Sequence, residues 1–359
     1  MLKAYKYRLY PNEEQKNYFA NCFGCARFIY NQMLSDKIDH YKETKQMLNN
    51  TPAQYKEEFS FMKAVDSLAL ANAQQNLERA YKNFFRDKSI GFPKFKSKHR
   101  SKASYTTNNQ GGNIRIEDGK IKLPKIGFVK LVQHRTFQGK IKSCTISIYK
   151  SGKYFISILV ESADEMPQWV ERKIGIDLGV SDFAITTNDL GETEKHKNPK
   201  HLYKSEKKLK KAQRSLSRKQ KGGKNRNKAR LKVAKKHEKI ANQRKDFLHK
   251  LTKKITDENQ VIVIETLSSK NLMKNHKLAK SISDAGWYEF VRQLEYKSKQ
   301  KGRTIIKADR FYPSSQICSS CGHRDGEKPL QIRVWHCPTC GECLDRDINA
   351  SKNLLALAK

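Results

Sequence analysis

Apolar residues in the N-terminal part of the chain follow a helical spacing. From Tyr18 to Met33 they recur every three or four positions, which is one face of a helix. Asn12 suits the N-cap of this helix, and the two glutamates that follow it suit the positive end of its dipole. A second helix is predicted from Val65 to Arg86. Its apolar stripe consists of Leu70, Ala73, Leu77, Tyr81 and Phe84.

Alternating apolar and polar residues then predict strands. Residues 114–123 alternate around an Asp-Gly dipeptide, which is typical of a tight hairpin turn. Residues 144–160 form a second hairpin around Ser-Gly. We therefore expect residues 1–170 to form a small β-barrel or sandwich that carries a helical insertion at about residues 12–90.

The pattern changes again after Lys173. Two short apolar runs, residues 174–180 and 261–265, have the length of buried strands, and each contains or ends in an acid. A long basic helical pair, residues 200–256, separates them. The other expected elements are a strand at 183–187, a helix at about 287–300, a strand at 304–307 and a short C-terminal helix. The chain therefore reads as an α/β multidomain protein.

The charge balance indicates a polyanionic partner. The chain has 73 Lys and Arg against 36 Asp and Glu, a net charge of +37. Such a chain repels itself unless a polyanion neutralises it, and nucleic acid is the usual one. No apolar run has the roughly 18 residues of a membrane span, and the N-terminus has no apolar signal core. We therefore expect a cytoplasmic protein with no membrane partner.

Two basic segments are candidates for binding phosphates. Between residues 200 and 245 there are 20 Lys and Arg but only 2 acids, too lopsided for a solvated face held by internal salt bridges. The candidates there are Lys207, Lys208, Lys211, Arg214, Arg218, Lys224, Arg226 and Arg230. A shorter stretch with Phe92 and Phe95 interleaved suits backbone contact and base stacking. Its candidates are Lys94, Lys96, Lys98 and Arg100.

Amide side chains on the helix at residues 65–86 leave two interpretations open. Gln74 and Gln75, flanked by Asn72 and Asn76, can read adenine edges. They are equally consistent with an ordinary helix surface.

The cysteines form the sharpest local motif. Cys318-x-x-Cys321 and Cys337-x-x-Cys340 are two knuckles of the kind that supply four thiolates to a structural zinc ion in a zinc ribbon. A glycine follows each knuckle, which favours Cys337/Cys340 over the alternative pair that Cys343 makes with Cys340. Another CxxC lies inside the first predicted helix, where core packing is the simpler interpretation.

Three acids follow or end apolar segments. Asp177, Glu265 and Asp347 would be costly to bury unless they bind something. If they converge, three carboxylates can hold two divalent cations about 4 Å apart and support hydrolysis of a phosphodiester. One acid alone is weak evidence, because Asp-x-Gly after a strand is often only a turn.

Asp345 and Asp347 compete for the third position. On a regular helix about 200° separates residues two apart, so both cannot face one metal pair. Helical steps from Asp347 reach Ala350, Leu354 and Leu357, an apolar stripe suited to packing on a sheet. We therefore assign Asp347 as the metal ligand and Asp345 as an N-terminal helix acid or a partner of Arg346 or a ribbon amide.

The order of motifs along nearly the full chain resembles a known family. These motifs are Lys3–Pro11, Gly91–Lys98, Ile174–Gly179, Val261–Glu265, Tyr312–Gly322 and Asp345–Ala350. Together they resemble TnpB, the OrfB-type proteins encoded by bacterial insertion sequences and similar to the compact ancestors of type V CRISPR effectors. One departure is visible at Cys343-Leu344, where members often carry His.

The resemblance implies a fold, an activity and a location in the bacterial cytoplasm, associated with the nucleoid. It implies an RNase H-like RuvC nuclease domain interrupted by a zinc ribbon, behind a wedge-type β-barrel with a helical recognition insertion. The β-barrel with its helical insertion corresponds to residues 1–170 and the zinc ribbon to residues 312–343. The nuclease domain corresponds to residues 171–311, with its final helix at 344–359. It also implies a guide RNA, double-stranded target DNA cleaved beside a short motif, two Mg²⁺ at Asp177, Glu265 and Asp347, and one Zn²⁺ at the four cysteines.

Two other functions compete with this interpretation. A nuclease-inactive, RNA-guided DNA-binding repressor is expected of relatives that have lost an acid, but all three acids are present here. A transposase that joins strands itself also uses three acids on an RNase H-like fold. The zinc ribbon and the basic pair favour guide binding over strand transfer.

Overall fold

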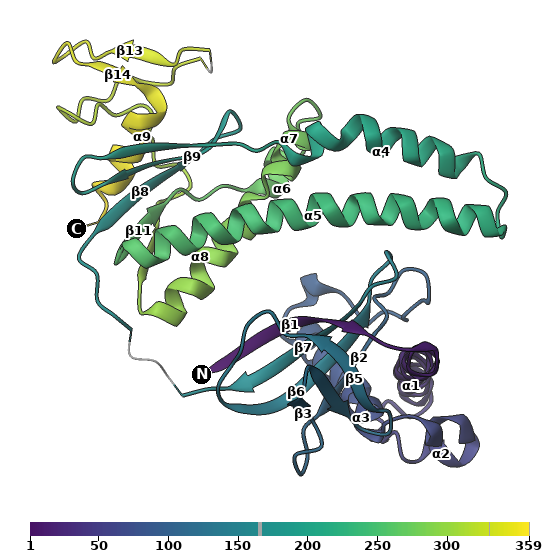
Figure 1. Cartoon of the computed structure of the whole chain (residues 1–359). Coiled ribbons are helices and arrows are strands. Elements are labelled where there is room, and N and C mark those ends of the chain that lie inside the picture. The colour runs from purple at the N-terminus through teal and green to yellow at the C-terminus, as the bar shows by residue number, and fades with distance from the viewer. Residues whose placement is uncertain (164–166, 330, 359) are drawn as a thin grey trace. The chain divides into compact units, whose positions relative to one another are not determined.

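The chain folds into two compact units, Met1–Asp164 and Glu165–Lys359. A computed structural model describes residues 1–163, 167–329 and 331–358 (Figure 1). Each unit combines a sheet with helices, so the expected α/β multidomain class is confirmed.

The first unit is built on a seven-stranded antiparallel sheet with the order β2-β6-β7-β1-β5-β4-β3. The strands are β1 (Leu2–Tyr10), β2 (Ser104–Asn108), β3 (Arg115–Glu117), β4 (Lys120–Leu123), β5 (Gly127–Val132), β6 (Lys140–Ile148) and β7 (Tyr154–Glu161). Asp118 and Gly119 join β3 to β4 with φ of 47° and 68°, the left-handed pair that a tight hairpin requires. The predicted hairpin is therefore confirmed, whereas the strand β1 was not predicted.

Helices fill the connection from β1 to β2. They are α1 (Glu13–Thr44), α2 (Tyr55–Glu58), η1 (Ser60–Ala64), α3 (Ser67–Arg86) and η2 (Lys88–Ile90). The Asn12 side chain accepts from the Gln15 amide at 2.8 Å, and the Gln15 side chain accepts from the Asn12 amide at 3.1 Å, a capping box at the predicted start of α1. For α1 and α3 together, three of the four helix ends lie within two residues of the predicted positions.

One hydrophobic core holds this unit together. Tyr7 and Leu9 of β1 pack with the apolar stripes of α1 and α3. Cys22 and Cys25 lie inside this core, and burial raises the pKa of Cys22 to about 11. The interpretation of this CxxC as core packing is confirmed.

The second unit contains a five-stranded sheet with the order β10-β9-β8-β11-β12. Its strands are β8 (Lys173–Leu178), β9 (Asp182–Asn188), β10 (Thr193–Lys197), β11 (Val261–Ile264) and β12 (Thr304–Lys307). Strand β9 pairs antiparallel with both β8 and β10, and β11 lies parallel to β8 and to β12. The carboxyl ends of β8, β11 and β12 therefore meet at one edge.

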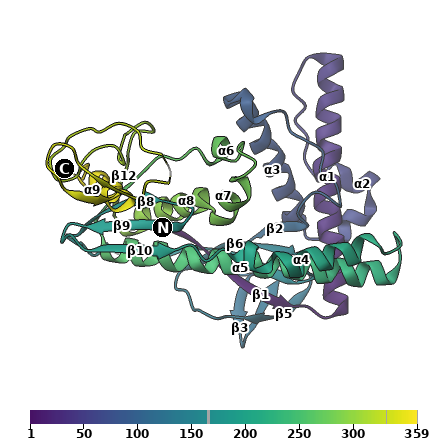
Figure 2. The same cartoon turned by 90° about the horizontal axis from the view of Figure 1, so that it is seen from above.

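Helices cover both faces of this sheet (Figures 1 and 2). The helices of this unit are α4 (His201–Ser217), α5 (Lys224–Glu258), α6 (Ser269–Leu272), α7 (Ala279–Ala285), α8 (Trp287–Lys301) and α9 (Arg346–Leu355). The apolar residues Ile262 and Ile264 of β11 face α5 and α8, whereas Val263 between them packs with Leu354 of α9. Strands β13 (Val334–His336) and β14 (Cys343–Asp345) form a separate small hairpin.

Gly175 lets α9 lie directly against β8. A Cβ atom at this position would lie 2.2 Å from the Ser351 carbonyl oxygen and 2.5 Å from the Leu355 amide nitrogen. Both obstructing atoms belong to helix backbone and cannot turn aside. At the same contact the hydroxyls of Thr187 and Ser351 are 2.6 Å apart. Only glycine therefore permits the observed approach of α9 to the sheet.

We predict that Gly175→Ala destabilises the second unit. The added methyl forces α9 away from β8, at a cost of about 1–3 kcal/mol. Differential scanning calorimetry should detect a fall of about 2–10 °C in the melting temperature of that unit.

The matched control is Gly24→Ala in the middle of α1. No atom lies within 4 Å of a Cβ built at Gly24, so the change should leave the melting temperature unchanged or slightly higher. Equal stability of Gly175→Ala and the parent protein would contradict the packing argument.

Candidate functional site

Side-chain alternation directs two of the three predicted acids toward α9. Asp177 lies two residues after Gly175 on β8, so it emerges on the face that α9 covers. Glu265 follows β11 and lies two residues after Val263, which packs against the same helix. Because β8 and β11 are paired in parallel with Ile176 beside Ile264, the two acids lie side by side.

Asp347 reaches these acids from α9. It is the second residue of that helix, and its charge raises the pKa values of both Asp177 and Glu265. The predicted stripe that continues from it is buried at Ala350 and Leu354.

The three carboxylates form a negatively charged site that nearby arginines compensate only in part. Burial, followed by the neighbouring charges of Glu265 and Asp347, raises the pKa of Asp177 well above its usual value. Burial and then the Asp347 charge raise the pKa of Glu265 to about 7, although the Leu178 amide donates to its Oε1 at 2.7 Å. Such acids favour either a proton or a cation between them.

Arg333 partly neutralises this site. Its Nη1 lies 3.1 Å and 3.3 Å from the two oxygens of Asp347. In the described part of the chain, only one group of three or more candidate metal-binding residues has its ligand atoms all within 4.8 Å of one another, and that group consists of cysteines. The acids are therefore near enough to interact electrostatically without forming as tight a cluster as the thiols.

Asp345 has a structural position at the start of α9. Its Oδ1 accepts from the amides of Asp347 and Ile348, each at 3.0 Å, and its Oδ2 pairs with Lys195 at 2.6 Å. The prediction of an N-terminal helix acid is confirmed. The suggested partner Arg346 is wrong, because that side chain donates instead to the carbonyls of Lys328 and Pro329.

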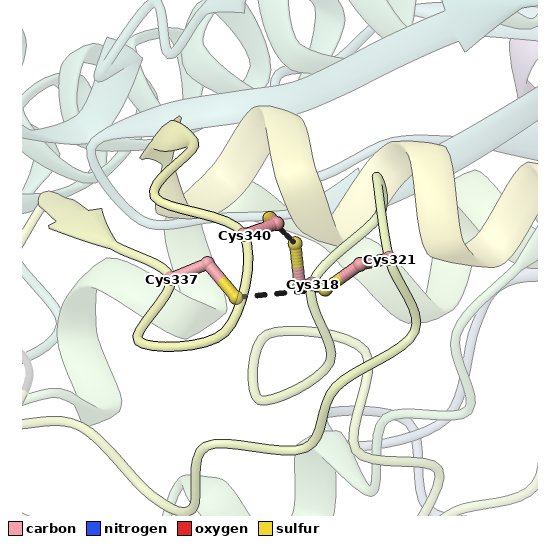
Figure 3. Close-up of side chains that lie close together, drawn as sticks. All are labelled: Cys318, Cys321, Cys337 and Cys340. Atoms are coloured by element: carbon pink, nitrogen blue, oxygen red, sulfur yellow. Dashed lines mark hydrogen bonds between the residues drawn. The ribbon is translucent and has the colours of Figure 1, made fainter.

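The four predicted cysteines converge from two loops (Figure 3). The Sγ atoms of Cys318 and Cys340 are 3.7 Å apart, and those of Cys321 and Cys337 are 3.6 Å apart. In a tetrahedral site with bonds of about 2.3 Å, sulfurs lie about 3.8 Å apart. The donor set and its spacing therefore suit a structural zinc ion.

Glycines close both knuckles, as expected. The Gly322 amide donates to the Cys318 carbonyl and the Gly341 amide to the Cys337 carbonyl, both at 2.9 Å, and both glycines have left-handed φ, 79° and 74°. Cys343 is exposed on β14 and is not part of the quartet.

The basic pair is an antiparallel helical arm formed by α4 and α5 (Figures 1 and 2). Seven of its eight candidate side chains are exposed, namely Lys207, Lys208, Lys211, Arg214, Arg218, Lys224 and Arg230. Arg226 is half-buried and donates to the carbonyls of Leu216 and Lys219, so it closes the turn between the helices. The base of the arm is fixed by Asp284, which accepts from Arg244 at 2.7 Å and from the Leu202 amide at 2.9 Å.

The shorter basic stretch lies in the first unit. Lys94, Lys98 and Arg100 are exposed, as are Phe92 and Phe95. Lys96 instead is half-buried, with its Nζ 3.6 Å from the centre of the Tyr30 ring.

A cavity of about 290 Å³ opens between α1, α3 and this stretch. Asn72 and Asn76 line it together with Arg27, Lys98 and Lys102. Of the two predicted amides, Gln75 is exposed and Gln74 donates to Glu78 at 2.7 Å, and neither lines the cavity. Helical spacing separates the two pairs, since Asn72 and Asn76 share a face that Gln74 and Gln75 do not.

Sequence reasoning did not identify Arg333, Lys195 and Gly175 as residues that shape the site. The arginine and lysine are isolated charges in a chain rich in them, so no local pattern distinguishes them. Gly175, in contrast, stands inside an apolar strand, which is itself a sign of a close backbone approach.

Comparison with known families assigns most of the chain. Residues 157–276 match the OrfB_IS605 family, described as a probable transposase, and residues 287–354 match the Cas12f1-like TNB domain. Residues 1–46 match a model described as a helix-turn-helix domain, although the structure has there one strand, β1, and one helix, α1.

Curated relatives match over nearly the whole chain. A protein of Streptomyces pristinaespiralis named "Putative RNA-guided DNA endonuclease" is 37% identical, covering 99% of this chain and 89% of its own length. The similarly named InsQ of Escherichia coli K12 is 32% identical, covering 99% and 92%.

A solved structure shares the fold. The chain in the cryo-EM structure of a Cas12f1–sgRNA–target DNA complex matches with a TM-score of 0.60 and 15% identity, covering 99% of this chain and 98% of the other. Among the described residues, no helix is both long enough and apolar enough to span a membrane.

We predict that Cys318→Ser or Cys337→Ser removes bound zinc and destabilises the hairpin of β13 and β14. Loss of one of four thiolates opens the site, whose formation contributes folding free energy. Zinc content is measured by inductively coupled plasma mass spectrometry on protein purified without chelators.

Cys343→Ser is the matched control and should retain about one zinc ion per chain. If Cys343→Ser empties the site and Cys337→Ser does not, the assignment of the second knuckle is wrong.

Proposed function

The chain belongs to the OrfB/IS605 family of TnpB proteins, and from this membership we propose that it is an RNA-guided DNA endonuclease. The observation that carries the proposal is the approach of Asp177, Glu265 and Asp347 to one another on one face of the five-stranded sheet. The names of the two full-length relatives support the same activity.

The nuclease domain is of the RNase H-like RuvC type. Three antiparallel strands continued by two parallel ones, with acids at the ends of β8 and β11, support this assignment. We assign residues 1–170 to a wedge-type barrel with its helical insertion, 171–311 and 344–359 to the nuclease domain, and 312–343 to the zinc ribbon. The match to a TNB domain over residues 287–354 supports the ribbon, which holds one Zn²⁺ at its four cysteines.

Two Mg²⁺ ions at the three carboxylates would supply an activated water and stabilise the leaving oxygen of the phosphodiester. The chain's own contribution is to hold the carboxylates. Asp177 and Glu265 are fixed by paired strands, and the Leu178 amide orients Glu265. Asp347 must exchange its ion pair with Arg333 for a cation, which an exposed arginine allows at small cost.

The guide RNA binds along the basic helical arm. A wide groove on α4 is lined by Lys207, Lys210, Lys211, Arg214 and Arg218, which recur at helical spacing and so present their charges on one face. Base pairing between guide and target then carries most sequence specificity, and the protein reads backbone shape and the short motif beside the target.

The cavity at α3 is the candidate reader of that motif. Asn72 and Asn76 line this cavity together with Arg27, Lys98 and Lys102, which combines hydrogen-bonding groups for base edges with cations for the flanking phosphates.

We predict that Asp347→Asn abolishes magnesium-dependent cleavage and leaves guide and target binding intact. The substitution keeps the shape of the side chain and removes one negative ligand from the site. Plasmid cleavage and filter binding, measured on one preparation loaded with its co-purified RNA, give the two results.

Asp345→Asn is the matched control two residues away. Asparagine is an equally good N-cap, so α9 should begin at the same residue and cutting should remain measurable. If Asp347→Asn still cleaves DNA and Asp345→Asn does not, the assignment of Asp347 as the metal ligand is wrong.

The same assays distinguish the competing functions. Strand transfer of transposon ends by the parent protein would favour the transposase instead, and target binding by the parent protein without cleavage would favour the repressor.

We also predict that guide RNA stabilises the protein against heat. Neutralising part of the +37 charge lowers self-repulsion, so the melting temperature should rise by several degrees at low salt, and the gain should shrink as salt increases. Equal melting with and without guide RNA in differential scanning fluorimetry would show that the basic arm is not an RNA site.

A further inference from the structure

The turn Asp309–Phe311 is an exposed projection that no role above explains. It lies one residue, Ala308, beyond the end of β12, and all three of its residues are exposed. The Phe311 side chain is 82% exposed, an unfavourable place for a large apolar ring.

Both ends of this turn are anchored. On one side, the buried Ala308 donates its amide to the Ile264 carbonyl at 2.9 Å, and the Thr266 hydroxyl donates to the Ala308 carbonyl at 2.7 Å. On the other side, the Tyr312 hydroxyl donates to the Asn353 carbonyl at 3.1 Å. The projection therefore stands on fixed supports from β11 and α9.

The turn itself is held by Asp309. Its Oδ1 accepts from the Phe311 amide at 2.8 Å, and its carbonyl oxygen accepts from the Tyr312 amide at 3.1 Å. The acid is thus used in shaping the turn. The ring of Phe311 is presented to solvent by a defined backbone conformation.

This projection stands at the edge of the sheet that carries the acids. Lys307 of β12 pairs beside Ile264 of β11, which pairs beside Ile176 of β8, so Ala308 lies in line with Glu265 and Asp177. Adjacent strands lie about 4.8 Å apart, which puts the base of the turn roughly 5 Å from the backbone of Glu265 and roughly 10 Å from that of Asp177. The base of the turn is therefore one strand away from Glu265 and two strands away from Asp177.

Arg310 adds a cation to the ring. Its guanidinium carbon lies 5.4 Å from the centre of the Phe311 ring, and its side chain is exposed. An exposed ring beside an exposed guanidinium is the pair of groups that binds an unpaired base and its phosphate.

We propose that Phe311 and Arg310 form a subsite for the DNA strand being cut, in which the Phe311 ring stacks on one unpaired base next to the scissile phosphate and Arg310 contacts its backbone. Guide pairing displaces a single strand of the target, which supplies unpaired bases to this site. The subsite rests on the proposed nuclease function and adds a group that positions the substrate. It reads no sequence, because every base offers a ring face.

The test combines a protein change with a DNA change. Phe311→Ala should lower kcat/KM for cleavage about tenfold, because stacking on one base is lost, and leave guide and target binding unchanged. Phe311→Tyr should restore most of the rate. Single bases are then removed from the displaced strand, one position at a time. At one position, loss of the base should slow cleavage by the parent protein. The same DNA should be cut by Phe311→Ala no more slowly than intact DNA is, because the stacking contact is already missing.

A second readout does not depend on cutting. The fluorescent base 2-aminopurine is placed at the DNA position that the base-removal series identifies. Its fluorescence should be quenched in the complex with Asp347→Asn and brighter in the complex with the double variant that also carries Phe311→Ala. Trp169→Ala is the matched control. Trp169 is 72% exposed but precedes the amino end of β8, whereas the acids lie at the carboxyl ends of the strands, so this change should alter neither signal.

The outcomes separate the two proposals. Failure of the parent protein to cut guide-matched DNA refutes the nuclease function and the subsite with it. If the parent cuts normally and Phe311→Ala matches its rate and its 2-aminopurine signal, the subsite alone is refuted. Additive effects of Phe311→Ala and every base removal would likewise refute stacking.

Discussion

The contact between α9 and β8 at Gly175 is the constraint on which the site depends. Asp177 and Glu265 need only a parallel strand pair to become neighbours, but Asp347 arrives from a segment about 80 residues further along the chain. A helix backbone that lies against the sheet at Gly175 carries Asp347 to the face where the other two acids emerge. The ribbon, inserted just before α9, adds Arg333 to the same place.

Charge has two opposite roles in this molecule. At the carboxylates, burial and mutual repulsion raise the pKa values of Asp177 and Glu265, so the protein gains from a cation there. Along the basic arm, exposed lysines and arginines far outnumber the acids, 20 against 2 between residues 200 and 245, and this surface gains from an anion. A phosphodiester strand together with divalent cations satisfies both surfaces, which is why the geometry supports a nuclease better than a binding protein alone.

Sequence reasoning was most successful where one residue pattern determines the result. Helical spacing gave α1 and α3, the Asp-Gly pair gave the hairpin of β3 and β4, and two CxxC motifs gave the thiol quartet. It did not supply the contacts that depend on distant partners. Asp345 pairs with Lys195, Arg226 closes a turn, and Asn72 and Asn76 line the cavity that Gln74 and Gln75 do not. Such contacts are set by tertiary packing, which leaves no local periodicity to read.

The most direct test of the central claim is anomalous X-ray scattering from crystals of the guide-RNA complex grown with Mn²⁺ in place of Mg²⁺. The account predicts anomalous peaks bonded to carboxylate oxygens of Asp177, Glu265 and Asp347, with the Arg333 side chain moved off Asp347. Mn²⁺ ordered elsewhere on the protein, with these three carboxylates free of metal and the Arg333 pair intact, would contradict it.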